Sequence, residues 1–161
     1  MSTIEDRLAE MGLTLPTPAA PVAAYTPVVV AGGMAYVSGQ VSMKDGALIK
    51  GRLGEDMDID AGMAAAQACG LMIVAQLKAA LGSLERVEKI VKLGAFVACT
   101  PDFTDQPKVA NGASELMQAL FGDAGVHARS AVGVPALPLG VAVEIDAVVQ
   151  LRAGGAAQRD A

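Results

Sequence analysis

The sequence predicts an α+β domain in which two helices lie on one face of a β-sheet. Segments with strand and helix patterns follow one another in the order strand, strand, short strand, helix, strand, helix, strand, strand. Both helical segments are apolar over at least one face and need a sheet to cover them. The last strand alternates apolar residues with the polar pair Glu144 and Asp146, as a strand with one covered face does. These observations favour a single domain with one core.

Residues 1–24 are expected to form an N-terminal helix and an extended arm. Ser2 and Glu5 have the spacing of a capping box, and Gly12 ends the helix. Residues 15–22 are rich in Pro and Ala, which favours an extended chain. The arm is expected to pack against the domain because it carries four large apolar side chains, Leu8, Met11, Leu13 and Leu15.

The next segment predicts a hairpin. Residues 28–30 and 34–37 are strand-like and flank Gly32 and Gly33, which tolerate the positive φ of a tight turn. The second strand is expected to continue through residues 38–41 past a bulge, and a short strand is expected at residues 48–49.

A long helix is predicted next, with Asp58 or Asp60 as its N-cap, an end near Leu81 and Gly82 as its stop signal. Its apolar stretch, residues 61–77, is interrupted by two glutamines and a glycine, so it is interpreted as a buried helix and not as a membrane span. Residues 83–87 are expected to form one short helical turn.

The second half of the chain supplies the remaining elements. Residues 90–98 are apolar on both faces, which predicts a central strand. Pro107 suits the first turn of a second helix that ends at Gly122, with Val109, Ala113, Leu116 and Leu120 on one face. Residues 131–134 and 141–151 are expected to form a final strand pair, and residues 153–161 a frayed tail.

Composition limits the function classes. The 161-residue chain is 53% hydrophobic and has no Trp, so such a small aliphatic domain is expected to bury further surface in an oligomer. A net charge of -5 argues against a nucleic-acid partner, because phosphate binding needs a basic face. Cys69 and Cys99 are expected as buried thiols in a reducing compartment. No charged, apolar leader precedes Leu8, which favours a cytoplasmic protein.

Two residues near the end of the chain carry most of the chemistry. Arg129 stands at the start of an apolar strand, and an arginine fork is well suited to hold a planar carboxylate. Glu144 lies between apolar residues, where a carboxylate can orient or activate a water. The alternatives are an interface salt bridge for Arg129, and for Glu144 either a pairing with Arg129 or a solvent-facing position.

His127 is the only histidine and can act as a general acid or have a structural role. One His and two separated Cys lack zinc-site spacing, so no metal is expected.

The chain resembles the Rid family of trimeric enamine/imine deaminases, also called YjgF-type proteins. The resemblance covers residues 24–151 and depends on an ordered set of short matches, namely Tyr25, Gly33-Met34-Ala35-Tyr36-Val37-Ser38-Gly39-Gln40, Leu81-Gly82-Ser83-Leu84-Glu85, Asn111, Ala128-Arg129-Ser130, Leu137-Pro138 and Val143-Glu144-Ile145-Asp146-Ala147. It implies a chorismate-mutase-like mixed sheet in a Rid-like domain spanning residues 25–152. Three subunits would close into a trimeric barrel with sites in the clefts between them.

The resemblance also implies roles for individual residues. Arg129 would bind the substrate carboxylate, and Glu144 would orient the attacking water. Tyr25 would be the third catalytic residue, and Ser38, Gly39, Asn111 and Ala131 would bind the substrate. The alternatives are an interface aromatic for Tyr25, a turn residue for Ser38 and a backbone cap or bridge for Asn111. The chain departs from the family at Ala131, where members often have Cys, in one extra residue between Asn111 and Arg129, and in its longer N-terminus.

The function implied is hydrolysis of a small 2-imino or enamine acid to ammonia and a 2-keto acid, without a cofactor. Because an imine is already reactive, positioning of carboxylate and water supplies most of the catalysis. The partners expected are a small carboxylate-bearing substrate and two further copies of the chain, with no nucleic acid and no membrane. The alternatives are a trimeric binder or sensor of small carboxylates without turnover, and, most weakly, a ribonuclease or translation inhibitor.

Overall fold

The computed structural model describes residues 1–18, 20 and 24–153. Within these residues a mixed five-stranded sheet has the order β1-β2-β7-β5-β6, and β3 pairs with β4 in a small second sheet. All neighbours in the large sheet are antiparallel except β5 and β6, which are parallel. The strand bounds are β1 Val28–Ala31, β2 Met34–Val41, β3 Met43–Lys44, β4 Ala47–Leu48, β5 Val87–Ala98, β6 Ala128–Val134 and β7 Val143–Leu151.

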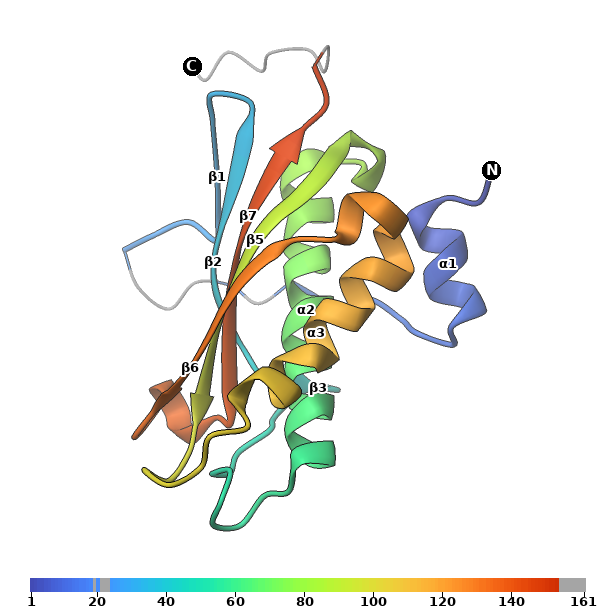
Figure 1. Cartoon of the computed structure of the whole chain (residues 1–161). Helices are drawn as coiled ribbons and strands as arrows, with labels where there is room; N and C mark the ends of the chain where they lie inside the picture. The colour runs from blue at the N-terminus through green and yellow to red at the C-terminus, as the bar shows by residue number, and fades with distance from the viewer. Residues whose placement is uncertain (19, 21–23, 154–161) are drawn as a thin grey trace.

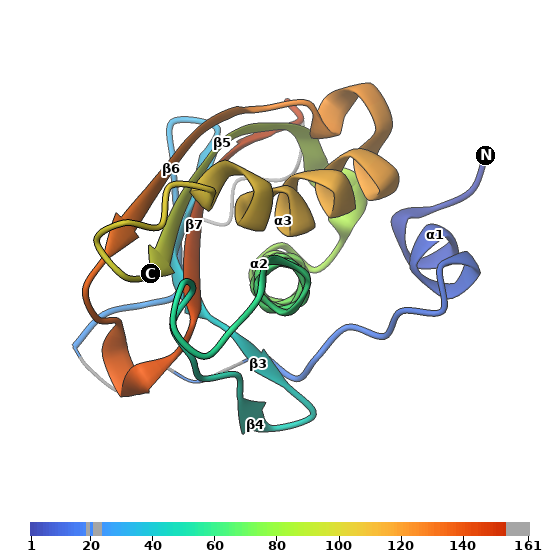
Figure 2. The ribbon, with the colours of Figure 1, turned by 60° about the horizontal axis from the view of Figure 1, so that its bottom comes forward.

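Helices α2 (Ile59–Leu81) and α3 (Gln106–Phe121) lie side by side on one face of the large sheet, which confirms the predicted layering (Figures 1 and 2). Asp58 is the N-cap of α2, since its carboxylate accepts a hydrogen bond from Ala61 N at 2.8 Å. Gly82 ends the helix with a left-handed φ of 78°. Of the two predicted caps, Asp60 therefore lies inside the first turn.

The core is the aliphatic layer between these helices and the sheet. It includes Ile73 and Leu77 of α2, Leu116 of α3, Leu93 of β5 and Ile145 of β7, all of which are fully buried. Helix α2 is long and apolar enough to cross a membrane by length and composition, yet 67% of its apolar window is buried inside the domain. It is the central core helix that the sequence predicts.

The predicted hairpin is present, with Gly32 and Gly33 both at positive φ between β1 and β2. The predicted bulge is also present, because the register between β2 and β7 shifts between Val37 and Gln40. The short strand expected at residues 48–49 is β4, at residues 47–48, and its partner β3 was not predicted.

The predicted pairing of the last two strands is wrong, because β5 lies between β6 and β7. At the end of β5 the Cys99 amide donates to Val134 O and the Ala98 amide donates to Ala142 O, so the connection from β6 to β7 steps across this strand end. The physical reason is the helix between β5 and β6: a strand-helix-strand crossover returns the chain parallel to its starting strand. Two successive strands with a short link suggested a hairpin instead.

The N-terminal helix α1 (Ile4–Glu10) packs on the outer side of α3. Its capping box is Thr3 with Asp6, one residue after the predicted pair Ser2 and Glu5. Ile4 and Leu8, one turn apart, are its buried residues. Arg7 donates to Leu120 O at 2.6 Å. Of the other apolar residues expected to pack, Leu13 and Leu15 are half-buried, whereas Met11 is 41% exposed.

The remaining described elements are three short 3-10 helices, η1 Leu84–Arg86, η2 Gly122–Gly125 and η3 Pro138–Gly140. The first is the helical turn expected at residues 83–87. The predicted tail lies outside the described residues, except for Ala153, and so do four residues of the predicted extended arm, 19 and 21–23.

Candidate functional site

Arg129 lies on the helix side of β6, at the edge of the sheet, and its guanidinium contacts α3. Its Nη1 donates to Asn111 Oδ1 at 2.9 Å and to Ser114 Oγ at 3.0 Å, and its Nη2 donates to Pro107 O at 3.2 Å. All three acceptors are neutral. Among the residues that the structure describes, no carboxylate forms an ion pair with Arg129. The alternative of an Arg129–Glu144 pair is therefore not realised within this chain.

Ser114 and His127 are two members of this cluster that the sequence did not assign to the site. Ser114 Oγ lies 2.8 Å from His127 Nε2, and His127 Nδ1 lies 2.6 Å from Gly125 O. Ser114 follows Asn111 by three residues and so shares its face of α3. This spacing is the sequence feature that could have predicted Ser114 as a site residue. His127 precedes β6, and no periodic pattern predicts that its ring reaches α3.

Glu144 lies on the opposite face of the sheet from Arg129. It alternates with the buried Val143 and Ile145 of β7, and its register partners are Val41 on β2 and Phe96 on β5. A Cβ atom on Gly39 would come within 2.8 Å of Glu144 Cδ, so only glycine leaves this carboxylate its place beside the β2 bulge. The predicted face of Glu144 is confirmed by this register.

Glu144 and Asp146 lie on the open face of the sheet, which is the face turned away from α2 and α3, and both have raised pKa values. Burial is the larger cause for Glu144, and the neighbouring Asp146 carboxylate adds to it. Burial also raises the pKa of Asp146, against the opposing effects of a hydrogen bond from the Gly94 backbone and of Lys92. A carboxyl with a raised pKa can accept and return a proton nearer to neutral pH than an ordinary glutamate can.

The raised pKa predicts how stability depends on pH. The folded chain holds the Glu144 proton more tightly than the unfolded chain, whose ordinary pKa is 4.5. Stability is therefore lost as pH rises from about that value through the folded pKa. We expect Glu144→Gln to match the wild-type melting temperature near pH 4 and to exceed it at pH 7. Melting curves across this pH range test this, and a variant less stable than wild type at pH 7 would contradict it.

The predicted site residues form two groups in the structure. Arg129 and Asn111 are in direct contact, and Ala131 follows two residues later on β6, on the same face as Arg129. On the other side of the sheet Ser38 and Gly39 form the bulge beside Glu144.

Ser38 and Tyr25 complete the second group in different ways. Gln40 Nε2 donates to Ser38 O at 3.0 Å and to Ser38 Oγ at 3.3 Å, which fixes the bulge. Gln40 in turn accepts a hydrogen bond from Gln76 at 3.2 Å in the core. Tyr25 precedes β1 and is 50% exposed. Within the described ranges its side chain forms no hydrogen bond or ion pair with either group.

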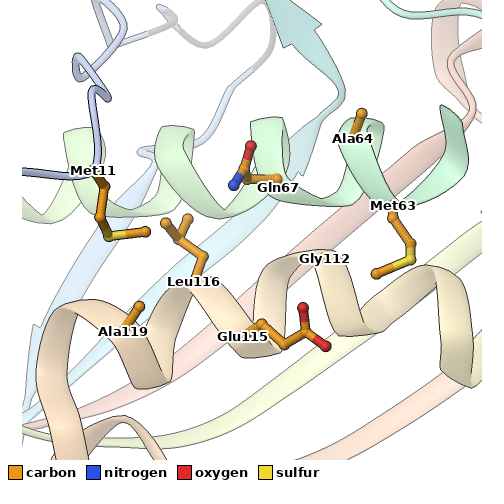
Figure 3. Close-up of a pocket in the computed structure, with 8 residues that line it drawn as sticks. All are labelled: Met11, Met63, Ala64, Gln67, Gly112, Glu115, Leu116 and Ala119. Carbon is orange, nitrogen blue, oxygen red and sulfur yellow. The ribbon is translucent and has the colours of Figure 1, made fainter. Parts of the chain in front are cut away.

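Two hollows lie elsewhere on the described part of the chain. One, of about 340 Å³, is a groove between α2 and α3 whose wall includes Gln67 and Glu115, with Met11 at one end (Figure 3). The other, of about 630 Å³, lies between residues 12–17, the β3–β4 hairpin and α2. Neither includes any predicted site residue.

Other chemistries have little support in the described part of the chain. No cluster of three His, Cys, Asp or Glu side chains that suits a metal ion is found there. Cys69 and Cys99 are both buried and unpaired, as the sequence predicts, and burial raises the pKa of the Cys69 thiol. Cys69 donates instead to Val143 O at 3.4 Å.

Comparison with known proteins gives matches over nearly the whole chain. Residues 5–151 match a family described as "YjgF/chorismate mutase-like, putative endoribonuclease". Protein TCP17 of Trypanosoma cruzi is 49% identical over 146 residues, which are 89% of this chain and 91% of that protein.

Solved structures agree with these matches. A "putative endoribonuclease" from Shewanella oneidensis MR-1 is 34% identical, with a TM-score of 0.90 over 93% of this chain and 100% of that one. RidA from the Antarctic bacterium Psychrobacter sp. PAMC 21119 is 29% identical, with a TM-score of 0.56 over 86% of this chain and 96% of that one. The matched range of the family begins inside α1, so it includes most of the N-terminal helix.

Proposed function

Because this chain belongs to the YjgF/chorismate mutase-like family, we propose that it hydrolyses small 2-imino or enamine acids to ammonia and 2-keto acids. Arg129 binds the substrate carboxylate in this proposal, and Glu144 of a neighbouring subunit orients the attacking water. The substrate is held and hydrated by side chains and backbone, without a cofactor. The proposed setting is the cytoplasm.

The main support for the proposal is that the Arg129 guanidinium has neutral hydrogen-bond partners and donors left for a ligand. Three of its five N–H groups donate to neutral acceptors, which fix the plane of the guanidinium without cancelling its charge. The N–H of Nε and one N–H of Nη2 have no partner among the described residues. Two donors and an uncompensated charge at a sheet edge suit a carboxylate, which accepts two parallel hydrogen bonds from arginine.

The separation of the two groups supports a site shared between subunits. Arg129 and Glu144 lie on opposite faces of one sheet, so a small ligand reaches both only if each comes from a different subunit. The open face of the sheet is apolar enough to be covered, since Val29, Tyr36 and Val132 are each about half exposed there. We propose the homotrimer that the family resemblance implies, with one site in each cleft.

The proposed chemistry needs little from the protein. Water adds to the carbon of the C=N bond and gives a tetrahedral carbinolamine, and a proton passes to the nitrogen. Loss of ammonia then leaves the C=O of the 2-keto acid. Glu144 holds the water by accepting its hydrogen bond, together with a backbone carbonyl near Ala131. Its raised pKa suits the transient uptake of the water proton.

A binder or sensor without turnover is the second candidate. It is favoured by the completeness of the Arg129 group, whose contacts with Asn111, Ser114 and Pro107 require nothing from Glu144. The ribonuclease name carried by some relatives is the weakest alternative. A net charge of -5 and the carboxylates of Glu144 and Asp146 on the open face oppose binding of a phosphate backbone.

The proposed assembly and activity are tested together. We expect light scattering at micromolar concentration to give three times the 16.2 kDa chain mass. We also expect the protein to accelerate ammonia release from an imine that an amino-acid oxidase generates in the same solution. A monomeric mass would remove the shared site. A trimer that binds a 2-keto acid but leaves the ammonia rate unchanged would favour the sensor.

A further inference from the structure

We propose that Ser114 and His127 are positioning residues of the carboxylate site, which hold Arg129 in its binding orientation through a continuous hydrogen-bonded chain. The inference rests on the proposed function of Arg129 as the carboxylate anchor. The chain runs from Gly125 O to His127, from His127 to Ser114 Oγ and from Ser114 Oγ to Arg129 Nη1. It joins η2, the start of β6 and the middle of α3.

The direction of the hydrogen bonds follows from the acceptor at one end. Gly125 O can only accept, so His127 Nδ1, at 2.6 Å, carries the hydrogen. In the neutral ring Nε2 is then an acceptor, and Ser114 donates its only hydrogen to it. The oxygen lone pairs of Ser114 are thereby turned toward the Nη1 N–H of Arg129. His127 thus makes Ser114 an acceptor for the guanidinium.

Gly125, at one end of this hydrogen-bonded chain, is closely packed. Gly125 is buried and packs against the backbone of Met117 so closely that a Cβ atom would clash with the Met117 carbonyl. Ser114 is only 7% exposed and belongs to the interior face of α3. The histidine therefore bridges a closely packed backbone carbonyl of η2 and a buried hydroxyl of α3, and the hydroxyl in turn contacts Arg129 at the edge of the sheet.

The arrangement also explains why neutral groups hold Arg129. A carboxylate in place of Ser114 would fix the guanidinium equally well but would cancel the charge that the substrate carboxylate needs. A hydroxyl oriented by a histidine fixes Nη1 and leaves the positive charge for the ligand. Orientation matters because bidentate recognition requires the guanidinium plane to match the carboxylate plane.

The test compares Ser114→Ala with Gln118→Ala, a substitution at an exposed position one turn further along α3. Pyruvate, a small 2-keto acid, is the probe for calorimetry, and the oxidase-coupled assay gives KM and kcat. We expect Ser114→Ala to raise the pyruvate Kd by up to about tenfold, because a guanidinium that is no longer held in place must be ordered when the ligand binds. KM should rise by a similar factor with kcat nearly unchanged, since the contact is the same in ground and transition states.

His127 supplies the second pair of variants. His127→Leu should raise the pyruvate Kd, and His127→Gln should recover part of the affinity, because its amide oxygen can accept from Ser114 near the place of Nε2. A purely structural role would lower the melting temperature and leave the Kd of the folded protein unchanged. Ser114→Ala and Gln118→Ala with equal Kd values would overturn the inference.

The same measurements separate this inference from the proposed function. Wild type that binds pyruvate without turnover refutes the deaminase, while the ratio of Kd values still decides the role of Ser114. Wild type that binds no pyruvate overturns both, since no carboxylate site then exists to be positioned.

Discussion

Arg129→Ala is expected to reduce kcat/KM for a 2-imino acid by about 10²-fold or more, in a protein that keeps its fold and its subunit number. Among the described residues the guanidinium donates only to Asn111, Ser114 and Pro107 of α3, so its loss leaves three neutral acceptors and no buried unpaired charge. The measurement is oxidase-coupled ammonia release, with light scattering and a melting curve to show that the protein is intact.

Arg129→Lys is the matched control for charge. An ammonium group keeps the positive charge but cannot copy the bidentate fork or reach three acceptors in one plane, so partial recovery is expected. Full activity in Arg129→Lys would mean that charge alone suffices at this position. An Arg129→Ala variant as active as wild type would remove the carboxylate anchor and the enzyme proposal with it.

Glu144→Gln is expected to lower turnover by about 10²–10⁴-fold if Glu144 takes up a proton, and by less if it only orients water. Pyruvate binding should persist, because in the proposed site the carboxylate is held by Arg129 of the neighbouring subunit and Glu144 contacts only the water. Calorimetry and ammonia-release kinetics on the same preparation separate the two effects. Equal turnover in both proteins would exclude Glu144 from the mechanism.

Mixed trimers of the two variants test whether the site is shared. Coexpressed Arg129→Ala and Glu144→Gln chains should regain about a quarter of wild-type activity, because random assembly gives each cleft about one chance in four of holding both intact residues. Each variant alone supplies the baseline. If both residues of a site belonged to one subunit, no mixture would exceed that baseline, because every subunit carries one of the two substitutions.

The N-terminal helix shows how far local patterns can be followed. The apolar residues predicted that this helix packs on the domain, and its Leu8 side chain is buried in the structure. The cap was misplaced by one residue because Ser2 with Glu5 and Thr3 with Asp6 have the same spacing. Ile4 and Leu8 share a face with either start, so their spacing does not choose between the two caps. In the structure the Ile4 amide at the helix start donates to Glu85 Oε1 at 3.2 Å, a long-range contact that no local spacing records.

The sequence by itself determined the features that depend on local period and turn chemistry. The alternation along β7 placed Glu144 on the open face, the pair Gly32 and Gly33 placed the hairpin, and Asp58 with Gly82 bounded the core helix. Each of these follows from a repeat of two or 3.6 residues, or from a glycine that tolerates positive φ. The candidate anchor Arg129 was predicted differently, from its residue type at the start of an apolar strand and from the family resemblance.

Tertiary structure alone decided which of these residues meet. The crossover through α3 set β6 parallel to β5 and inserted β5 between β6 and β7. The register on β5 then places Arg129 beside Leu93 and Glu144 beside Phe96, on opposite faces of the sheet. It also brought Ser114 and His127, 13 residues apart in the chain, within 2.8 Å of each other. Such contacts depend on the rotation of a helix about its axis and on the order of strands. Long-range packing fixes both, and no local period of the sequence records them.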